Sequence, residues 1–164
     1  MRELPVLLLV PMSKEDFQLY EKEITIEYAK DLAIAEGLTQ EQSLARSQAS
    51  TDSLLPDGYS TKNMWIFSPQ NKEGETVGVL WLALNDQEES EMYVYDIEIF
   101  EQFRSRGFGR ALMVAAEEFT REIGMERIGL NVFGHNPKAK ALYESLNYEV
   151  RSTSPGKIQM VKKL

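Results

Sequence analysis

The chain has no cysteine among its 164 residues, so it forms no disulfide, binds no metal through thiolates and carries no acyl group on a cysteine. It has a single histidine, His135. A metal site or a Ser-His-Asp set would therefore need carboxylates to supply the remaining groups. We expect no metal, and we expect His135 to serve in loop packing or capping.

Long hydrophobic runs are also missing. The apolar run nearest the start, Val6 to Val10, is bracketed by Pro5 and Pro11 and is too short to span a membrane. It also lacks the pattern of a cleaved signal peptide. We interpret it as a buried first strand, and we expect a cytoplasmic protein that does not associate with membranes.

Basic residues are few relative to acidic ones, with 18 Lys and Arg against 26 Asp and Glu and a net charge of -8. A general binder of nucleic-acid backbones needs the opposite sign, so nucleic acid is not expected as a partner. The acidity is consistent with a cationic substrate. It is equally consistent with charge repulsion that keeps a soluble protein dispersed.

The sequence has no repeat, low-complexity tract or linker, which predicts a single domain. Three helices are expected in the first third: one from Lys14 capped by Ser13, one over Ile24–Glu36, and one from a Thr39/Gln42 capping box to Leu54. Strands are expected at 63–68, 76–84, 91–100 and 127–133, helices at 107–123 and 136–146, and a final hairpin from 148–151 and 157–163. This order predicts an α+β fold with an antiparallel run and a mixed sheet.

The most informative segment follows the strand that ends near Phe100 and opens the next helix. Gly107 and Gly109 allow a tight turn whose N–H groups converge at a helix N-terminus, an arrangement that binds phosphate. Three basic residues, Arg104, Arg106 and Arg110, surround it. The glycines could instead serve only as a turn. A dinucleotide fingerprint would need a third glycine in place of Leu112, and the chain has no Gly-Lys-Ser/Thr string of a nucleotide-triphosphate loop.

Two stretches together resemble a known family. Arg104-Ser105-Arg106-Gly107-Phe108-Gly109 is similar to the Arg/Gln-x-x-Gly-x-Gly/Ala signature of the GNAT superfamily of N-acetyltransferases. The stretch from Asn136 to Tyr148 resembles that family's Asn-x-x-Ala-x-x-Leu-Tyr-x-x-x-Gly-Tyr/Phe element, with Asn147 in place of the glycine. Asparagine tolerates the left-handed backbone, so we expect the turn to be kept.

The resemblance implies a central, mixed, splayed sheet flanked by helices. In a single domain of residues 1–164, residues 1–60 would be the variable substrate side and residues 76–164 the acetyl-CoA-binding core. The resemblance also assigns acetyl-CoA contacts to Ile97, Glu98 and Ile99 on the bulged strand, to the pyrophosphate cradle Arg104, Ser105, Arg106, Gly107, Phe108, Gly109, Arg110 and Ala111, and to Asn136 and Tyr143 beside the pantetheine arm and the sulfur.

Three residues are candidates for catalysis. Tyr143 could protonate the departing thiolate, although its spacing also suits a packed core aromatic. Asp96 and Glu98 are two apart on one strand, so they share a face from which one of them could accept the amine proton. A solvated edge or a structural ion pair explains these carboxylates as readily. Some family members carry a catalytic Glu where this chain has Asn131, which cannot act as a base.

The sequence therefore predicts an enzyme that moves an acetyl group from acetyl-CoA to a primary amine of a small molecule, peptide or protein by direct attack. One alternative is a CoA-binding sensor or interaction module without activity, and another is a hydroxyl acceptor. The identity of the amine is not encoded in any motif. A homodimer is expected from family habit alone.

Overall fold

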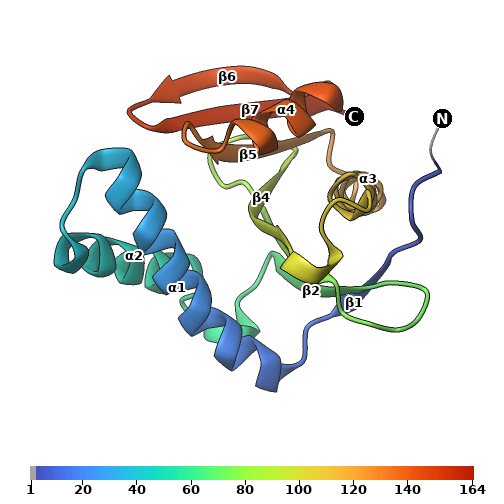
Figure 1. Ribbon diagram of the computed structural model, residues 1–164, viewed down its shortest axis with the longest axis horizontal. Coiled ribbons are helices and arrows are strands. Elements are labelled where there is room, and N and C mark those ends of the chain that lie inside the picture. The colour runs from blue at the N-terminus through green and yellow to red at the C-terminus, as the bar shows by residue number, and fades with distance from the viewer. Residues whose placement is uncertain (1–2) are drawn as a thin grey trace.

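The computed structural model describes residues 3–164, which build a seven-stranded sheet with helices on both faces (Figure 1). The strands are β1 Leu8–Pro11, β2 Met64–Gln70, β3 Gly78–Leu84, β4 Glu91–Ile99, β5 Arg127–Phe133, β6 Glu149–Ser154 and β7 Lys157–Lys163. The helices are α1 Lys14–Glu36, α2 Gln40–Leu54, α3 Phe108–Ile123 and α4 Pro137–Ser145, with short 3-10 turns at Gly58–Ser60 and Glu101–Phe103.

The strands lie in the order β1-β2-β3-β4-β5-β7-β6. Every neighbouring pair is antiparallel except β4 and β5, which run parallel and are joined through α3. Parallel neighbours need such a crossover, whereas the antiparallel pairs β2–β3, β3–β4 and β6–β7 follow one another in the chain through short loops. The α+β class, the antiparallel run and the mixed sheet predicted from the sequence are confirmed.

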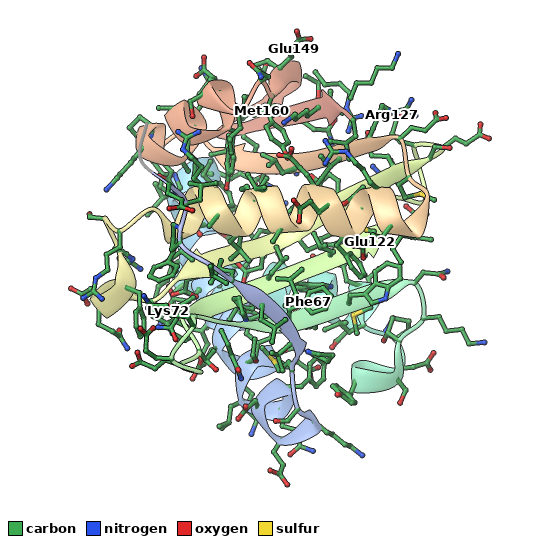
Figure 2. All side chains as sticks on the ribbon, turned by 90° about the vertical axis from the view of Figure 1, so that its right-hand side faces the viewer. Phe67, Lys72, Glu122, Arg127, Glu149 and Met160 are labelled. Atoms are coloured by element: carbon green, nitrogen blue, oxygen red, sulfur yellow. The ribbon has the colours of Figure 1, made fainter. Side chains whose placement is uncertain are left out.

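The two faces of the sheet carry different helices. In Figure 1, α1 and α2 lie on one side of the sheet and α3 on the other, and Figure 2 shows α3 lying across its face. The α3 face buries a large apolar cluster in which Leu112 and Met113 meet Leu80, Met92 and other strand residues. The α1 face buries a second cluster that contains Phe17, Tyr20, Val79 and Trp81.

Helix α1 is one continuous helix of 23 residues rather than the two that the sequence predicted. The reason is local: the segment contains no glycine or proline that would break it. Its ends match the expected signals, since the Ser13 hydroxyl accepts a bond from the Asp16 N–H (3.1 Å) and Gly37 takes the left-handed conformation (φ 65°). The Thr39/Gln42 capping box of α2 is confirmed.

The N-terminal apolar run is not the buried strand that the sequence predicted. Strand β1 begins at Leu8, whose exposed fraction is 63%, and Val6 is 68% exposed. Because β1 forms the edge of the sheet and pairs only with β2, only part of its surface is covered. Among residues 3–164, no helix combines the length and apolar character required to cross a membrane.

A buried carboxylate stabilises the part of the sheet in which the parallel strands β4 and β5 are paired. Glu91, at the start of β4, has a fully buried side chain and receives two bonds from the Arg151 guanidinium (2.5 and 2.8 Å). Asn85 donates a third bond to it (2.6 Å), and the Arg127 Nε lies 3.8 Å away. A buried charge is tolerated only when it is paired and hydrogen-bonded in this way. The network therefore ties β4 to β5 and to β6.

Replacing Arg151 with methionine is expected to lower the free energy of unfolding by about 3 kcal/mol, because it leaves the Glu91 charge buried with its main partner gone. Urea unfolding followed by circular dichroism measures this loss. The matched control is Lys140→Ala, which breaks an exposed i,i+4 pair with Glu144 and is expected to cost less than about 0.5 kcal/mol. Equal losses in the two variants would contradict the assignment.

Candidate active site

The site begins where β4 and β5 part. The two strands pair only over Glu91–Val94 and Arg127–Leu130. On its other side β4 stays paired with β3, but the register shifts, with Trp81 opposite Asp96 and Leu82 opposite Val94. Tyr95 is therefore the extra residue of a β-bulge, which bends the strand. Beyond it, β4 turns away from β5, and within residues 3–164 its backbone groups on that side have no strand partner, as expected for a splayed sheet.

The parting leaves a cleft of about 1210 Å³. Its walls come from β4, β5, the N-terminal end of α3, α4 and one face of α1. Gly78 contributes by allowing β3 to approach β4 closely, since a Cβ atom there would lie 1.9 Å from the Glu98 carbonyl oxygen. A concave space of this size, where polar groups converge from several elements, is the usual setting of a ligand site.

One end of the cleft has the features of an anion site. Gly107 begins α3 in the left-handed conformation (φ 85°), which a side chain would strain, and Ser105 also has a positive φ of 62°. These turns bring backbone N–H groups to the positive end of a helix of 16 residues. Arg104 donates from its Nε to the Ile99 carbonyl (2.8 Å), and Arg110 donates to the Ser145 hydroxyl (2.8 Å).

Most of the residues singled out from the sequence meet in this cleft. The lining includes Asp96, Ile97, Glu98, Ile99, Arg104, Ser105, Gly107, Phe108, Gly109, Arg110, Asn136 and Tyr143. Two others do not line it: the Arg106 guanidinium lies over the Phe103 ring (5.9 Å), and Ala111 is buried. Arg106 therefore contributes to the turn before α3, and Ala111 to the packing of that helix.

Asn136 begins α4 at the edge of the cleft. Its side-chain oxygen accepts a bond from the Ala139 N–H (3.2 Å), which leaves the amide NH₂ as a donor that can face a ligand. At the other end of α4, Asn147 takes a positive φ of 72°. The prediction that asparagine keeps the turn normally made by glycine is therefore confirmed.

The two carboxylates of β4 face α1. Asp96 accepts a hydrogen bond from the Tyr20 hydroxyl (2.6 Å). Burial raises the pKa of Asp96 to about 6, against the lowering effect of that bond, and Glu98 raises it further. Burial also raises the pKa of Glu98, which is more exposed, while Arg104 opposes this shift. Asp96 is thus a carboxylate that changes charge close to neutral pH, the property required of a general base.

Tyr143 lies on α4 within the α3-side apolar cluster, and 7% of it is exposed. Burial, followed by the nearby Asp96 charge, raises the pKa of its phenol to about 12. The phenol therefore keeps its proton at neutral pH and can donate it. Tyr143 is therefore a packed aromatic whose side chain also lines the cleft, and its role as a proton donor stays a prediction.

The face that α1 turns toward the cleft was missed by sequence reasoning. Ile24, Glu27, Tyr28 and Asp31 line the cleft, and Tyr20 bonds Asp96 beside them. Their spacing of three and four residues marks one helix face. Spacing alone does not say what that face meets, because Tyr20 and Asp96 are 76 residues apart in the sequence.

Aromatic side chains form the wall beside that face. Trp81 and Tyr95 lie with ring centroids 5.2 Å apart, and Tyr95 and Tyr93 4.9 Å apart. Trp81 is 4% exposed and lines the cleft, and among the described residues its Nε1 has no hydrogen-bond partner. His135 stacks on Phe133 and contacts Asp31 through Nε2 (2.9 Å), the loop packing expected for it.

Comparison with known proteins decides what kind of site this is. The model of the acetyltransferase (GNAT) family matches residues 27–148. The chain belongs to the GNAT family of acetyltransferases. Because this match includes α3, α4 and the parted strands, the cleft is the candidate active site of a GNAT enzyme.

Two curated relatives support the same family. The chain is 31% identical to the uncharacterized N-acetyltransferase YycN of Bacillus subtilis over 145 residues, which are 87% of this chain and 92% of that protein. It is 28% identical to the uncharacterized N-acetyltransferase YdgE of the same organism, over 85% of this chain and 90% of that protein.

Solved structures show the same GNAT fold. The crystal structure of YycN aligns with a TM-score of 0.85 at 27% identity, over 91% of this chain and 96% of that chain. The PaiA N-acetyltransferase of Thermoplasma acidophilum, solved with coenzyme A, aligns with a TM-score of 0.69 at 16% identity, over 97% and 99% of the two chains. The second likeness concerns the fold alone.

Proposed function

We propose that this GNAT enzyme transfers the acetyl group of acetyl-CoA to a primary amine by direct attack of the amine on the thioester. The observation that carries the proposal is a single cleft in which a basic, amide-rich helix end faces the same space as Asp96 and Tyr143. An anion-binding end, a carboxylate and a protonated phenol are the three groups that such a transfer needs.

The residues at the α3 end suit coenzyme A. Its pyrophosphate is doubly anionic, and the N–H groups after Gly107 with the side chains of Arg104, Arg110 and Lys138 offer complementary charge and donors. The unpaired edge of β4 beyond Tyr95 would meet the amide groups of the pantetheine arm. When bound, acetyl-CoA supplies an acetyl group activated as a thioester.

The chain's own side chains would move the protons. Asp96 accepts the proton that the attacking amine loses, directly or through water, because it is ionised above a pKa of about 6. The Tyr143 phenol, with its pKa raised to about 12, donates its proton to the sulfur that leaves. Glu98 lies on the same face, and we assign it to the acceptor end rather than to the proton transfer because it is more exposed.

The acceptor end of the cleft supports a cationic amine. Carboxylates outnumber basic side chains in the lining of the cleft: Glu27, Asp31, Asp86, Glu88, Asp96 and Glu98 against Arg104, Arg110, Lys138 and Lys157. Their mutual repulsion is visible in two of them, since the Glu27 charge raises the pKa of Glu98 and the Asp31 charge raises the pKa of Asp96. A positively charged acceptor would relieve this repulsion, and the aromatic wall at Trp81 and Tyr95 would pack its hydrocarbon part.

The proposal is tested by calorimetry with coenzyme A followed by product analysis. We expect saturable binding of coenzyme A to the folded protein. With acetyl-CoA and a panel of primary amines, we expect products heavier by one acetyl group that survive hydroxylamine, as amides do. Products cleaved by hydroxylamine would indicate a hydroxyl acceptor, and binding without turnover on any amine would favour the non-catalytic sensor.

Replacing Tyr143 with phenylalanine is expected to lower kcat about 100-fold, because the leaving thiolate loses its proton donor while the ring keeps its packing. The KM for acetyl-CoA should stay within about threefold of wild type. Steady-state kinetics with thiol detection measures both values.

Tyr148→Phe is the matched control for Tyr143→Phe. Tyr148 is a neighbouring buried tyrosine, with ring centroids 5.9 Å apart, whose hydroxyl bonds Glu117 (3.1 Å) instead of lining the cleft. The Tyr148→Phe variant should be somewhat less stable than wild type, and its kcat should stay unchanged. An unchanged kcat in Tyr143→Phe would remove the acid role.

A charge series tests the acceptor end. A straight-chain diamine should be acetylated with a higher kcat/KM than an amino alcohol of equal length, and an amino carboxylate should be the poorest substrate. Glu27→Gln should reduce the preference for the diamine about fivefold, the equivalent of about 1 kcal/mol of lost attraction. Glu41→Gln, on the exposed first turn of α2 and outside the cleft, serves as the control. An unchanged preference in Glu27→Gln would contradict this assignment.

A further inference from the structure

Tyr20 connects the first helix to the reacting end of the cleft. It lies in the first half of α1, is 6% exposed, and donates its hydroxyl hydrogen to the Oδ2 atom of Asp96 at 2.6 Å. Its ring packs in the α1-face cluster with Phe17, Val79 and Trp81. A phenylalanine would fill the same apolar space, so the hydroxyl has one visible use, the bond to Asp96.

The groups around Asp96 pull its ionisation in opposite directions. Glu98 on β4 and Asp31 on α1 add negative charge, and together with burial they favour the protonated carboxyl. Tyr20 on α1 and the backbone N–H of Ile97 favour the carboxylate. From α4, Tyr143 faces the same charge, which helps to keep that phenol protonated. Tyr20 is the one side chain in this set that stabilises the ionised form of Asp96 by donating to it.

Tyr20 is suited to remain a donor throughout the pH range in which the enzyme would work. Burial and the adjacent Asp96 and Glu98 charges raise the pKa of its phenol well above the ordinary value. The hydroxyl therefore does not compete for the role of base. Its hydrogen bond engages Oδ2 of Asp96, and because a carboxylate offers about four acceptor positions, Asp96 keeps the capacity to accept a proton.

We propose that Tyr20 is a positioning residue for acetyl transfer: its hydroxyl keeps Asp96 ionised and holds one carboxylate oxygen, so that the other is presented to the attacking amine. This inference rests on the proposed function through the role of Asp96 as base. It adds a residue outside both recognisable motifs, on the helix that forms the acceptor wall. It also makes α1 part of the proton-transfer apparatus.

The test compares Tyr20→Phe with wild type in two independent measurements. Carbon-detected NMR follows the titration of the Asp96 carboxyl, identified by its absence in Asp96→Asn. We expect the pKa of Asp96 to move upward by about 1 pH unit, because a hydrogen bond to the charged form is lost. The pH profile of kcat/KM should shift with this pKa, because the enzyme is active only when Asp96 has lost its proton. Its acidic limb should therefore move to higher pH by the same amount. Well above both pKa values most of the rate difference should disappear, and what remains reports the lost hold on the carboxylate.

Tyr59→Phe provides a matched control. Tyr59 is a second tyrosine against the same apolar cluster, with its ring 5.4 Å from Phe17, and its hydroxyl donates to the Met12 carbonyl (2.7 Å) rather than to Asp96. This variant also loses one phenolic hydrogen bond, so it should lose a similar amount of stability. In Tyr59→Phe, the pKa of Asp96 and the acidic limb of the kcat/KM profile should be the same as in wild type.

The outcomes separate the inference from the function on which it rests. A lower rate in Tyr20→Phe with an unmoved carboxyl titration and an unmoved acidic limb would overturn the positioning role. An acidic limb that persists unchanged in Asp96→Asn would show that another group is the base, and the catalytic role of Tyr20 would fall with that of Asp96. The NMR titration needs no acetyl acceptor, so it reports on the Tyr20 to Asp96 bond even when the true amine is unknown.

Discussion

The parting of β4 from β5 after four residue pairs is the constraint on which the site depends. The bulge at Tyr95 directs β4 away from its parallel neighbour, and the buried Glu91 with its arginine partners holds the other end of the pair together. A sheet closed along its whole length would have no cleft. Without the ion pairs of Glu91, the distance between the walls of the cleft would not be fixed. The reacting groups of an active site must be held in place to fractions of an ångström.

The charged side chains are distributed unevenly over the lining of the cleft. Basic side chains and helix N–H groups gather at the α3 end, whereas carboxylates from α1 and β4 line the side of the cleft that faces α1. In a protein of net charge -8, the arginines near Gly107 form a local exception, and that exception is where an anionic co-substrate would be held. Composition alone leaves open whether the acidity of the chain serves solubility or substrate binding. Part of this acidity comes from the carboxylates at the acceptor end of the cleft.

The second half of the chain was largely predictable from its sequence, because its signals are local. A glycine at Gly107 with a left-handed backbone and a capping asparagine at Asn136 act within their own turns, and the structure places both at the cleft. The first half was less predictable. The contact between Tyr20 and Asp96 depends on how a long helix docks on a distant strand, and the bulge at Tyr95 depends on register with β3. Neither leaves a pattern in neighbouring residues.

Helix α1 contacts both sides of the opening. Near its start Tyr20 is joined to β4, and near its end Asp31 meets His135 just after β5, at 2.9 Å. Helix α1 therefore spans the opening of the cleft and is held on both sides of it. Because one continuous helix makes both contacts, a change in the tilt of α1 would move Tyr20 and Asp31 together and would alter the opening on both of its sides.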